Sequence, residues 1–129
     1  MTVLERIRAT LEGLLADEQV PMKAVGYGGP TVKEYECWNY FVFNRIKRTK
    51  NNKSRMDRQT FYEVHIVHED FIPEGYIDRV IEALEAESDP GTKLRQTDDD
   101  VVFNYTRKGK TDLVVEIATV TFYHPEKRC

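Results

Sequence analysis

The stretch that most constrains the fold runs from Trp38 to Val67, where two strand-like runs flank a strongly basic connector. The first run, from about Glu36 to Lys47, is rich in aromatic and β-branched residues, which favour β-strands. The second run, from about Thr60 to Val67, alternates between apolar and polar side chains, as a strand does when one face is buried. The two runs therefore predict a long antiparallel hairpin with the basic segment as its tip or arm.

The basic connector sets the charge pattern of the chain. Residues 45–58 hold seven cations against one acid, a local balance of +6 in a chain whose net charge is −3, so the remaining residues sum to −9. Such an arm is suited to contact phosphates or an acidic protein surface, although a mobile, soluble hairpin tip is the alternative. With no aromatic residue in the segment, any DNA contact would be to the backbone, non-specific and salt-sensitive. The residues expected to face a partner or DNA are Arg45, Lys47, Arg48, Lys50, Lys53, Arg55 and Arg58.

The remaining segments predict one α+β domain over residues 1–129. Thr2 and Glu5 have the spacing of a capping box, which predicts a helix from about Val3. Apolar residues between Ile77 and Leu84 recur at helical spacing and predict a second helix. Further strands are expected at about 22–25, 101–106 and 113–123, before a short polar tail at 124–129. This order predicts a mostly antiparallel sheet of four to five strands with both helices packed on one face.

Two of the expected strands are apolar on both faces, whereas the helices can cover only one. The surplus apolar surface is expected to be buried against a neighbouring copy of the chain, which predicts a homo-oligomer. The candidate subunit-interface residues are Phe41, Phe43, Val114, Val120 and Phe122.

No catalytic or metal-binding pattern stands out, and we expect neither an enzyme nor a cofactor. His65 and His68 are three apart on an expected strand, so they point to opposite faces, whereas a metal pair on a strand needs a spacing of two. The run Asp98–Asp100 lacks the pattern of a calcium loop. Cys37 and Cys129 are expected to be free thiols. No window is long and apolar enough for a membrane helix, so no membrane partner is expected.

Two long segments resemble a family of small prophage proteins from Gram-positive bacteria. The residues from Phe43 to Gly75 read FNRIKRTKNNKSRMDRQTFYEVHIVHEDFIPEG, and those from Phe103 to Phe122 read FNYTRKGKTDLVVEIATVTF. Both are similar to segments of the tail terminator, or tail-completion, proteins of long-tailed non-contractile phages, which are also described as minor capsid or head–tail joining proteins. With the N-terminal helix, the likeness covers most of the chain.

The resemblance implies a structural role in virion assembly. Tail terminators are similar α+β domains that form a hexameric ring on the head-proximal end of the tail tube and stop its polymerisation. The implied partners are further copies of the chain, the tail-tube protein, the head connector and, non-specifically, DNA in the channel. The implied locations are the host cytoplasm during assembly and then the virion tail. The alternatives are another head–tail adaptor role in the same particle, or a small nucleic-acid-binding module that uses the basic hairpin.

Overall fold

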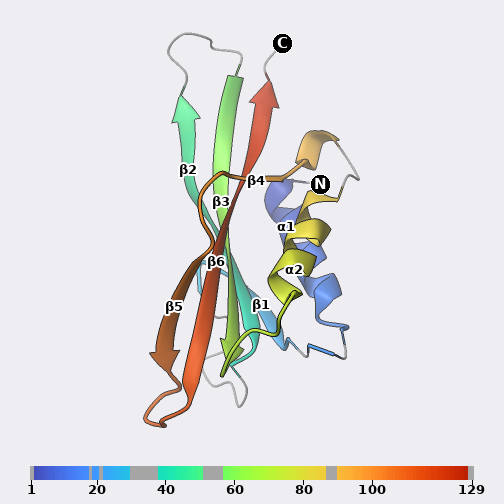
Figure 1. Cartoon of the computed structure of the whole chain (residues 1–129). Coiled ribbons are helices and arrows are strands. Elements are labelled where there is room, and N and C mark those ends of the chain that lie inside the picture. The colour runs from blue at the N-terminus through green and yellow to red at the C-terminus, as the bar shows by residue number, and fades with distance from the viewer. Residues whose placement is uncertain are drawn as a thin grey trace.

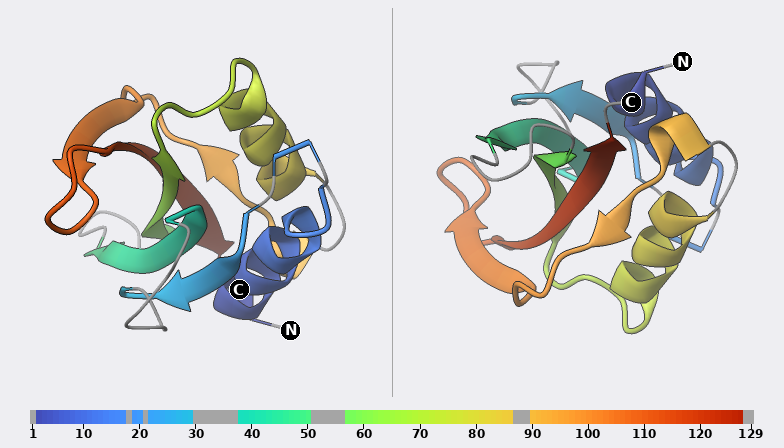
Figure 2. Two further views of the ribbon diagram at one scale, coloured as in Figure 1. Left: turned by 90° about the horizontal axis from the view of Figure 1, so that it is seen from below. Right: turned by 90° about the horizontal axis from the view of Figure 1, so that it is seen from above.

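The structure is a computed structural model that describes residues 2–17, 19–20, 22–29, 38–50, 57–86 and 90–127. Two helices lie side by side against one side of a long, twisted sheet (Figures 1 and 2), which confirms the α+β prediction. The elements in chain order are α1 (Val3–Leu14), β1 (Ala24–Tyr27), β2 (Tyr40–Lys50), β3 (Asp57–Glu69), α2 (Tyr76–Glu85), the 3-10 helix η1 (Pro90–Thr92), β4 (Arg95–Gln96), β5 (Val102–Arg107) and β6 (Val114–Lys127).

The two helices begin in different ways. The Glu5 amide donates to the Thr2 hydroxyl and the Thr2 amide donates to the Glu5 carboxylate, each at 3.1 Å, so α1 has the predicted capping box. The N-cap of α2 is Gly75, which has φ 81° and makes no side-chain cap. Glycine suits this left-handed conformation because it has no Cβ to clash.

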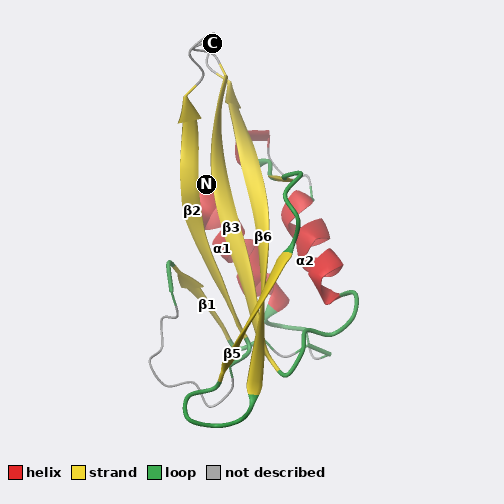
Figure 3. Ribbon diagram, turned by 60° about the vertical axis from the view of Figure 1, so that its left-hand side comes forward, coloured by secondary structure: helices red, strands yellow, loops and turns green. Residues whose placement is uncertain are grey.

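The sheet has six strands, more than the four to five expected, in the order β1-β2-β3-β6-β4, with β5 also paired to β6. β1 runs parallel to β2, and every other pairing is antiparallel. The predicted hairpin of β2 and β3 is confirmed. β3 and β6 pair without a shift from Asp57–Lys127 to Glu69–Val115, and they form the long axis of the molecule (Figure 3).

The core lies between the helices and the facing side of the sheet. Ile7 and Leu11 of α1 and Val80 and Leu84 of α2 are fully buried there, as the predicted helical periodicity requires. Alternate residues of the three central strands meet them from the sheet; these residues are Phe41, Phe43, Tyr62, Val64, Ile66, Ala118, Val120 and Phe122.

Buried and half-buried charges hold the helix layer together. Arg6 is 6% exposed and donates from Nη1 to the Thr92 carbonyl at 2.9 Å and from Nη2 to the Ala86 carbonyl. Arg6 therefore ties α1 to the end of α2 and to η1, and its burial lowers the pKa of the guanidinium. Arg79 of α2 forms an ion pair at 2.5 Å with Asp17, which follows α1.

Two strands are longer than the sequence predicts. β2 continues to Lys50, and β6 continues through Pro125 to Lys127, so the prediction of a polar tail at 124–129 is wrong as far as residue 127. Beyond Tyr123, β6 pairs only with β3 among the described strands, so Pro125 occupies an edge, where the lack of an amide hydrogen is tolerated. His124 is buried and its Nδ1 lies 2.6 Å from the Lys93 carbonyl.

Candidate functional site

The described residues of the basic segment, 45–50 and 57–58, belong to strands. Arg45, Lys47, Arg48 and Lys50 belong to β2 and Arg58 belongs to β3, while Lys53 and Arg55 lie outside the described residues. The predicted first strand, to about Lys47, already included Arg45 and Lys47, so the expectation of a connector is wrong only for Arg48, Lys50 and Arg58. The strands extend to the end of the molecule opposite the β5–β6 hairpin (Figure 1), and we call residues 44–50 and 57–61 the basic arm.

A β-bulge distributes the cations of the basic arm. Arg45 pairs with Tyr62 and Lys47 with Phe61, which leaves Ile46 as an extra residue without a partner in the ladder. The Lys47 ammonium lies 5.0 Å from the centre of the Phe61 ring, a cation–π contact, and Phe61 in turn lies beside Tyr123. Two aromatic rings therefore lie beside the cations of the basic arm, although residues 45–58 contain no aromatic residue.

A shallow groove of about 440 Å³ separates the basic arm from the start of α1. Its lining includes Thr2, Val3 and Leu4 from the helix and Arg45, Lys47 and Arg48 from β2. Among the described strands, β2 pairs with β3 alone beyond Phe43, so its outer edge is open there. An edge strand rich in Lys and Arg is a common protection against unwanted strand pairing.

Four of the five predicted subunit-interface residues are in the core of the chain itself. Phe41, Phe43, Val120 and Phe122 are at most 1% exposed and face the helices, so they have no free surface to offer a neighbour. Their assignment to an interface is wrong. Val114 alone remains accessible, at 39% exposed.

The opposite face of the sheet is also partly buried within the chain. Val42, Val67 and Val115 alternate with the core residues of their strands, and each is at most 9% exposed. A neighbouring copy is therefore not needed to cover these positions.

The exposed apolar residues gather instead around β5. All six residues of β5 are exposed, and among the described strands β5 pairs only with β6. Phe71, Phe103 and Tyr105 are 60%, 45% and 63% exposed, which is high for aromatic side chains. Exposed aromatic residues beside an open strand edge are typical of a surface that binds another protein.

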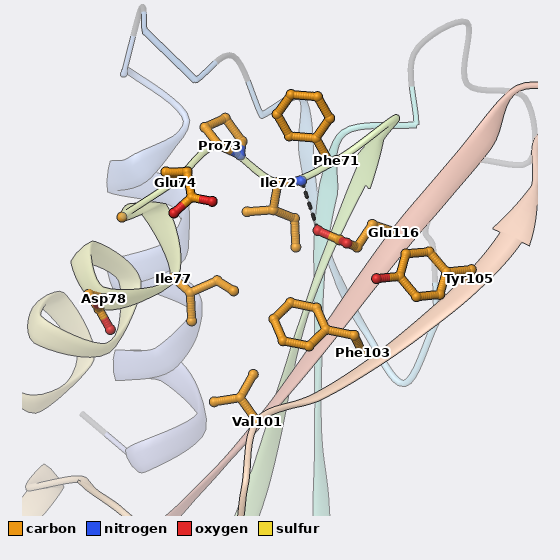
Figure 4. A pocket seen from close by; sticks show the side chains of 11 residues that line it. Phe71, Ile72, Pro73, Glu74, Ile77, Asp78, Val101, Phe103, Tyr105 and Glu116 are labelled. Carbon is orange, nitrogen blue, oxygen red and sulfur yellow. Dashed lines mark hydrogen bonds between the residues drawn. The ribbon is translucent and has the colours of Figure 1, made fainter.

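These aromatic residues line a groove of about 540 Å³ between the start of α2 and β5–β6 (Figure 4). Ile72 and Ile77 lie on one side of this groove, and Val101 and Phe103 lie on the other. We call it the acidic groove because the described residues that line it include three carboxylates and no cation; these residues are Phe71, Ile72, Pro73, Glu74, Gly75, Ile77, Asp78, Val101, Phe103, Tyr105 and Glu116.

The three carboxylates of the acidic groove differ in their contacts. Glu116 accepts a hydrogen bond from the Ile72 amide at 2.9 Å (Figure 4), and a hydrogen bond to Glu116 is the main cause of a raised pKa of the Tyr105 hydroxyl. By contrast, Glu74 and Asp78 are exposed, and no described residue forms an ion pair with either. Glu116 therefore shapes the groove, while the other two carboxylates present charge to the solvent.

The histidines have structural partners. His65 Nε2 lies 3.1 Å from Asn44 Oδ1 and its Nδ1 lies 2.9 Å from Thr119 Oγ1, which fits a neutral ring that donates from Nε2 and accepts at Nδ1. Burial lowers the pKa of His65, although Glu63 at 3.8 Å acts in the opposite direction.

His68 belongs to a second set of contacts at the end of β3. Its Nδ1 lies 2.6 Å from the Glu69 carbonyl, which can only accept, so this nitrogen carries the hydrogen. The Glu69 carboxylate contacts Lys108 at 2.5 Å and accepts from the Trp38 amide at 3.0 Å. Burial alone raises the pKa of Glu69, but these partners outweigh it and the pKa is lowered overall.

No cluster of three or more metal-binding side chains occurs among the described residues. Asp98, Asp99 and Asp100 lie in an exposed turn before β5, where the Thr97 hydroxyl donates to Asp99 at 2.9 Å. Cys37 and Cys129 are outside the described residues, so the expectation of free thiols stays a prediction. Within the described ranges, no helix has the length and apolar character needed to cross a bilayer.

The sequence did not reveal the acidic groove because its lining comes from three separate segments. The sequence predicted a strand at about 101–106, but not that its aromatic side chains would remain exposed beside the start of α2. Comparisons with known proteins give no further guidance, because no protein-family model matches the chain and no curated protein matches it either.

Proposed function

We propose that this protein is a structural component of a phage tail, a ring-forming tail terminator that caps the tail tube at its head-proximal end and joins it to the head connector. The observation that carries the proposal is the exposed apolar surface of β5 and Phe71, on a strand with an open edge. Such a surface favours a protein that works by self-association. The resemblance of residues 43–75 and 103–122 to tail terminators supplies the particular assembly.

The shape of the chain also supports an assembly role. The basic arm extends from one end of the sheet, and the exposed β5 surface lies toward the other (Figure 1). A subunit with different contact surfaces at its two ends can join its neighbours in a closed ring. In the proposed role, the basic arm lies near another virion component: the tube protein, the connector or the DNA backbone.

The test is negative-stain electron microscopy of the purified protein over a concentration series, alone and with its tail-tube protein. We expect closed rings at high concentration and tubes whose growth stops at one capped end. A protein that neither closes into rings nor changes tube length would contradict the proposal. Rings without capping would point to another head–tail adaptor role.

A nucleic-acid-binding module is the second candidate, because the exposed cations Arg45, Lys47 and Arg48 lie along one strand of the basic arm. Contacts from these residues would be to phosphates, so affinity for a DNA duplex should fall steeply as salt rises. Fluorescence anisotropy with a labelled duplex measures this directly. Binding that is independent of sequence and lost on reversal of Arg45 and Lys47 would favour this candidate over the tail role.

A further inference from the structure

The acidic groove combines exposed apolar walls with a charged rim, as a surface that binds another molecule does. Its walls are apolar, with Phe71 and Phe103 exposed, and its rim carries Glu74 and Asp78 without ion-pair partners among the described residues. Three further acids, Asp98–Asp100, directly precede Val101 of the lining. A complementary ligand would combine cationic groups with some apolar surface.

The basic arm has this complementary composition. Arg45 and Lys47 are exposed on either side of the bulge residue Ile46, which is itself 43% exposed. Together these three residues present two positive charges and one apolar side chain on a short length of strand. Arg45 and Lys47 are therefore opposite in charge to Glu74 and Asp78 of the acidic groove.

Within one molecule these surfaces cannot meet. They lie toward opposite ends of the sheet (Figure 1), and the β3–β6 ladder runs without interruption from the arm, at Phe61 and Tyr123, to the groove, at His68 and Glu116. This continuous ladder keeps the basic arm and the acidic groove of one chain apart. A contact between them needs two molecules.

We propose that the acidic groove of one copy binds the basic arm of a second copy. Such a contact is head-to-tail, because each subunit uses one surface toward one neighbour and the other surface toward the next. Repetition of this contact produces a ring when the rotation between subunits closes. This inference deepens the proposed function and rests on it in one respect, because the contact between arm and groove would build the proposed ring.

The test uses two double variants and their mixture. The arm variant carries Arg45→Glu and Lys47→Glu, and the groove variant carries Glu74→Lys and Asp78→Lys. Each is measured by sedimentation velocity over a concentration series at low and high ionic strength. We expect assemblies of the unaltered protein to weaken with salt, and the association constant of each variant alone to fall roughly a hundredfold, because like charges then face each other.

The mixture separates a head-to-tail contact from a symmetric one. The arm variant keeps an intact groove and the groove variant keeps an intact arm, and the reversed arm, now acidic, is also complementary in charge to the reversed groove, now basic. We expect an equal mixture to assemble beyond a dimer with the two variants alternating, whereas a mixture that stops at a one-to-one dimer would indicate a symmetric contact and overturn the head-to-tail proposal. A mixture that stays monomeric, or a variant that assembles as the unaltered protein does, would overturn the proposal.

Controls keep the result interpretable. Glu12→Lys on α1 and Lys23→Glu before β1 each reverse one charge in the same direction as the groove and arm variants, at exposed positions outside both surfaces, and these controls should assemble normally. Circular dichroism and thermal unfolding establish that all variants fold. The sedimentation assay contains this protein alone, so its result does not depend on the tail-tube protein. If the protein assembles here but does not cap tubes in the microscopy test, the tail-terminator role fails and the inference stands. An unaltered protein that stays monomeric at every concentration would overturn the inference.

Discussion

Two regions of β6 show that the helices determine which apolar side chains of a strand are buried. In the part of β6 that the helices cover, Ala118, Val120 and Phe122 are at most 1% exposed. At its start, beside β5, Val114 lies on the same face of the strand and is 39% exposed, although the apolar character of the sequence is similar. The difference teaches that an apolar strand face becomes core or contact surface according to what packs over it, not according to its own pattern.

The largest effect should come from a truncation in the covered region. Phe122→Ala removes a fully buried ring from the core and should lower the free energy of unfolding by about 3–5 kcal/mol, because a cavity remains. Urea denaturation followed by circular dichroism measures the change. A loss below about 1 kcal/mol would show that Phe122 does not belong to a tightly packed core.

A smaller effect is expected at His65, on the face of the sheet away from the helices. Its pKa is below the ordinary value of 6.5 in the folded chain, so the unfolded chain binds the proton more readily. Stability is therefore full above about pH 6.5 and declines as the pH falls through that value toward the lower folded pKa. In the variant His65→Gln this part of the decline should disappear.

The same variant has a measurable cost at high pH. The hydrogen bond that His65 donates to Asn44 and the one that it accepts from Thr119 are disrupted, which should lower stability by about 1–2 kcal/mol at pH 8. Urea denaturation of both proteins from pH 8 to pH 5 gives the two results together. A variant whose pH dependence matches that of the unaltered protein would assign the decline to other groups.

The smallest effect on folding should come from the matched truncation in the uncovered region. Phe103→Ala removes the same ring from a position that is 45% exposed, and it should change the stability of the monomer by about 1 kcal/mol or less. Its effect should appear in self-association, which sedimentation velocity detects. If Phe103→Ala destabilises the monomer as much as Phe122→Ala does, the proposed contrast between the regions fails.

Local sequence patterns predicted the helices and strands more accurately than the tertiary packing around them. The capping box of Thr2 and Glu5 and the β2–β3 hairpin are local in sequence, and both are confirmed. The length of β2 was underestimated because lysine and arginine are poor strand formers, although they suit an open edge. Here the tertiary pairing with β3 outweighed intrinsic preference.

The interface residues were predicted wrongly for a different reason. Period-two alternation separates Phe41 from Val42 but cannot tell which face the helices cover or whether the other face is also buried. The buried Arg6 was missed because it lies next to Ile7 on a helix whose apolar stripe gave no sign of a charge inside. The acidic groove depends on contacts between distant segments, which no local pattern reports.

The bulge at Ile46 has a consequence for the geometry of any assembly. An extra residue in one strand increases the local right-handed twist, so it rotates the basic arm about the long axis of the sheet. Because the continuous β3–β6 ladder connects the arm rigidly to the groove, this rotation sets the angle at which successive subunits would meet. In the proposed ring, the number of subunits would then depend on the backbone twist within one chain. Deletion of the bulge residue Ile46 would change the diameter of the ring without changing the residues in contact.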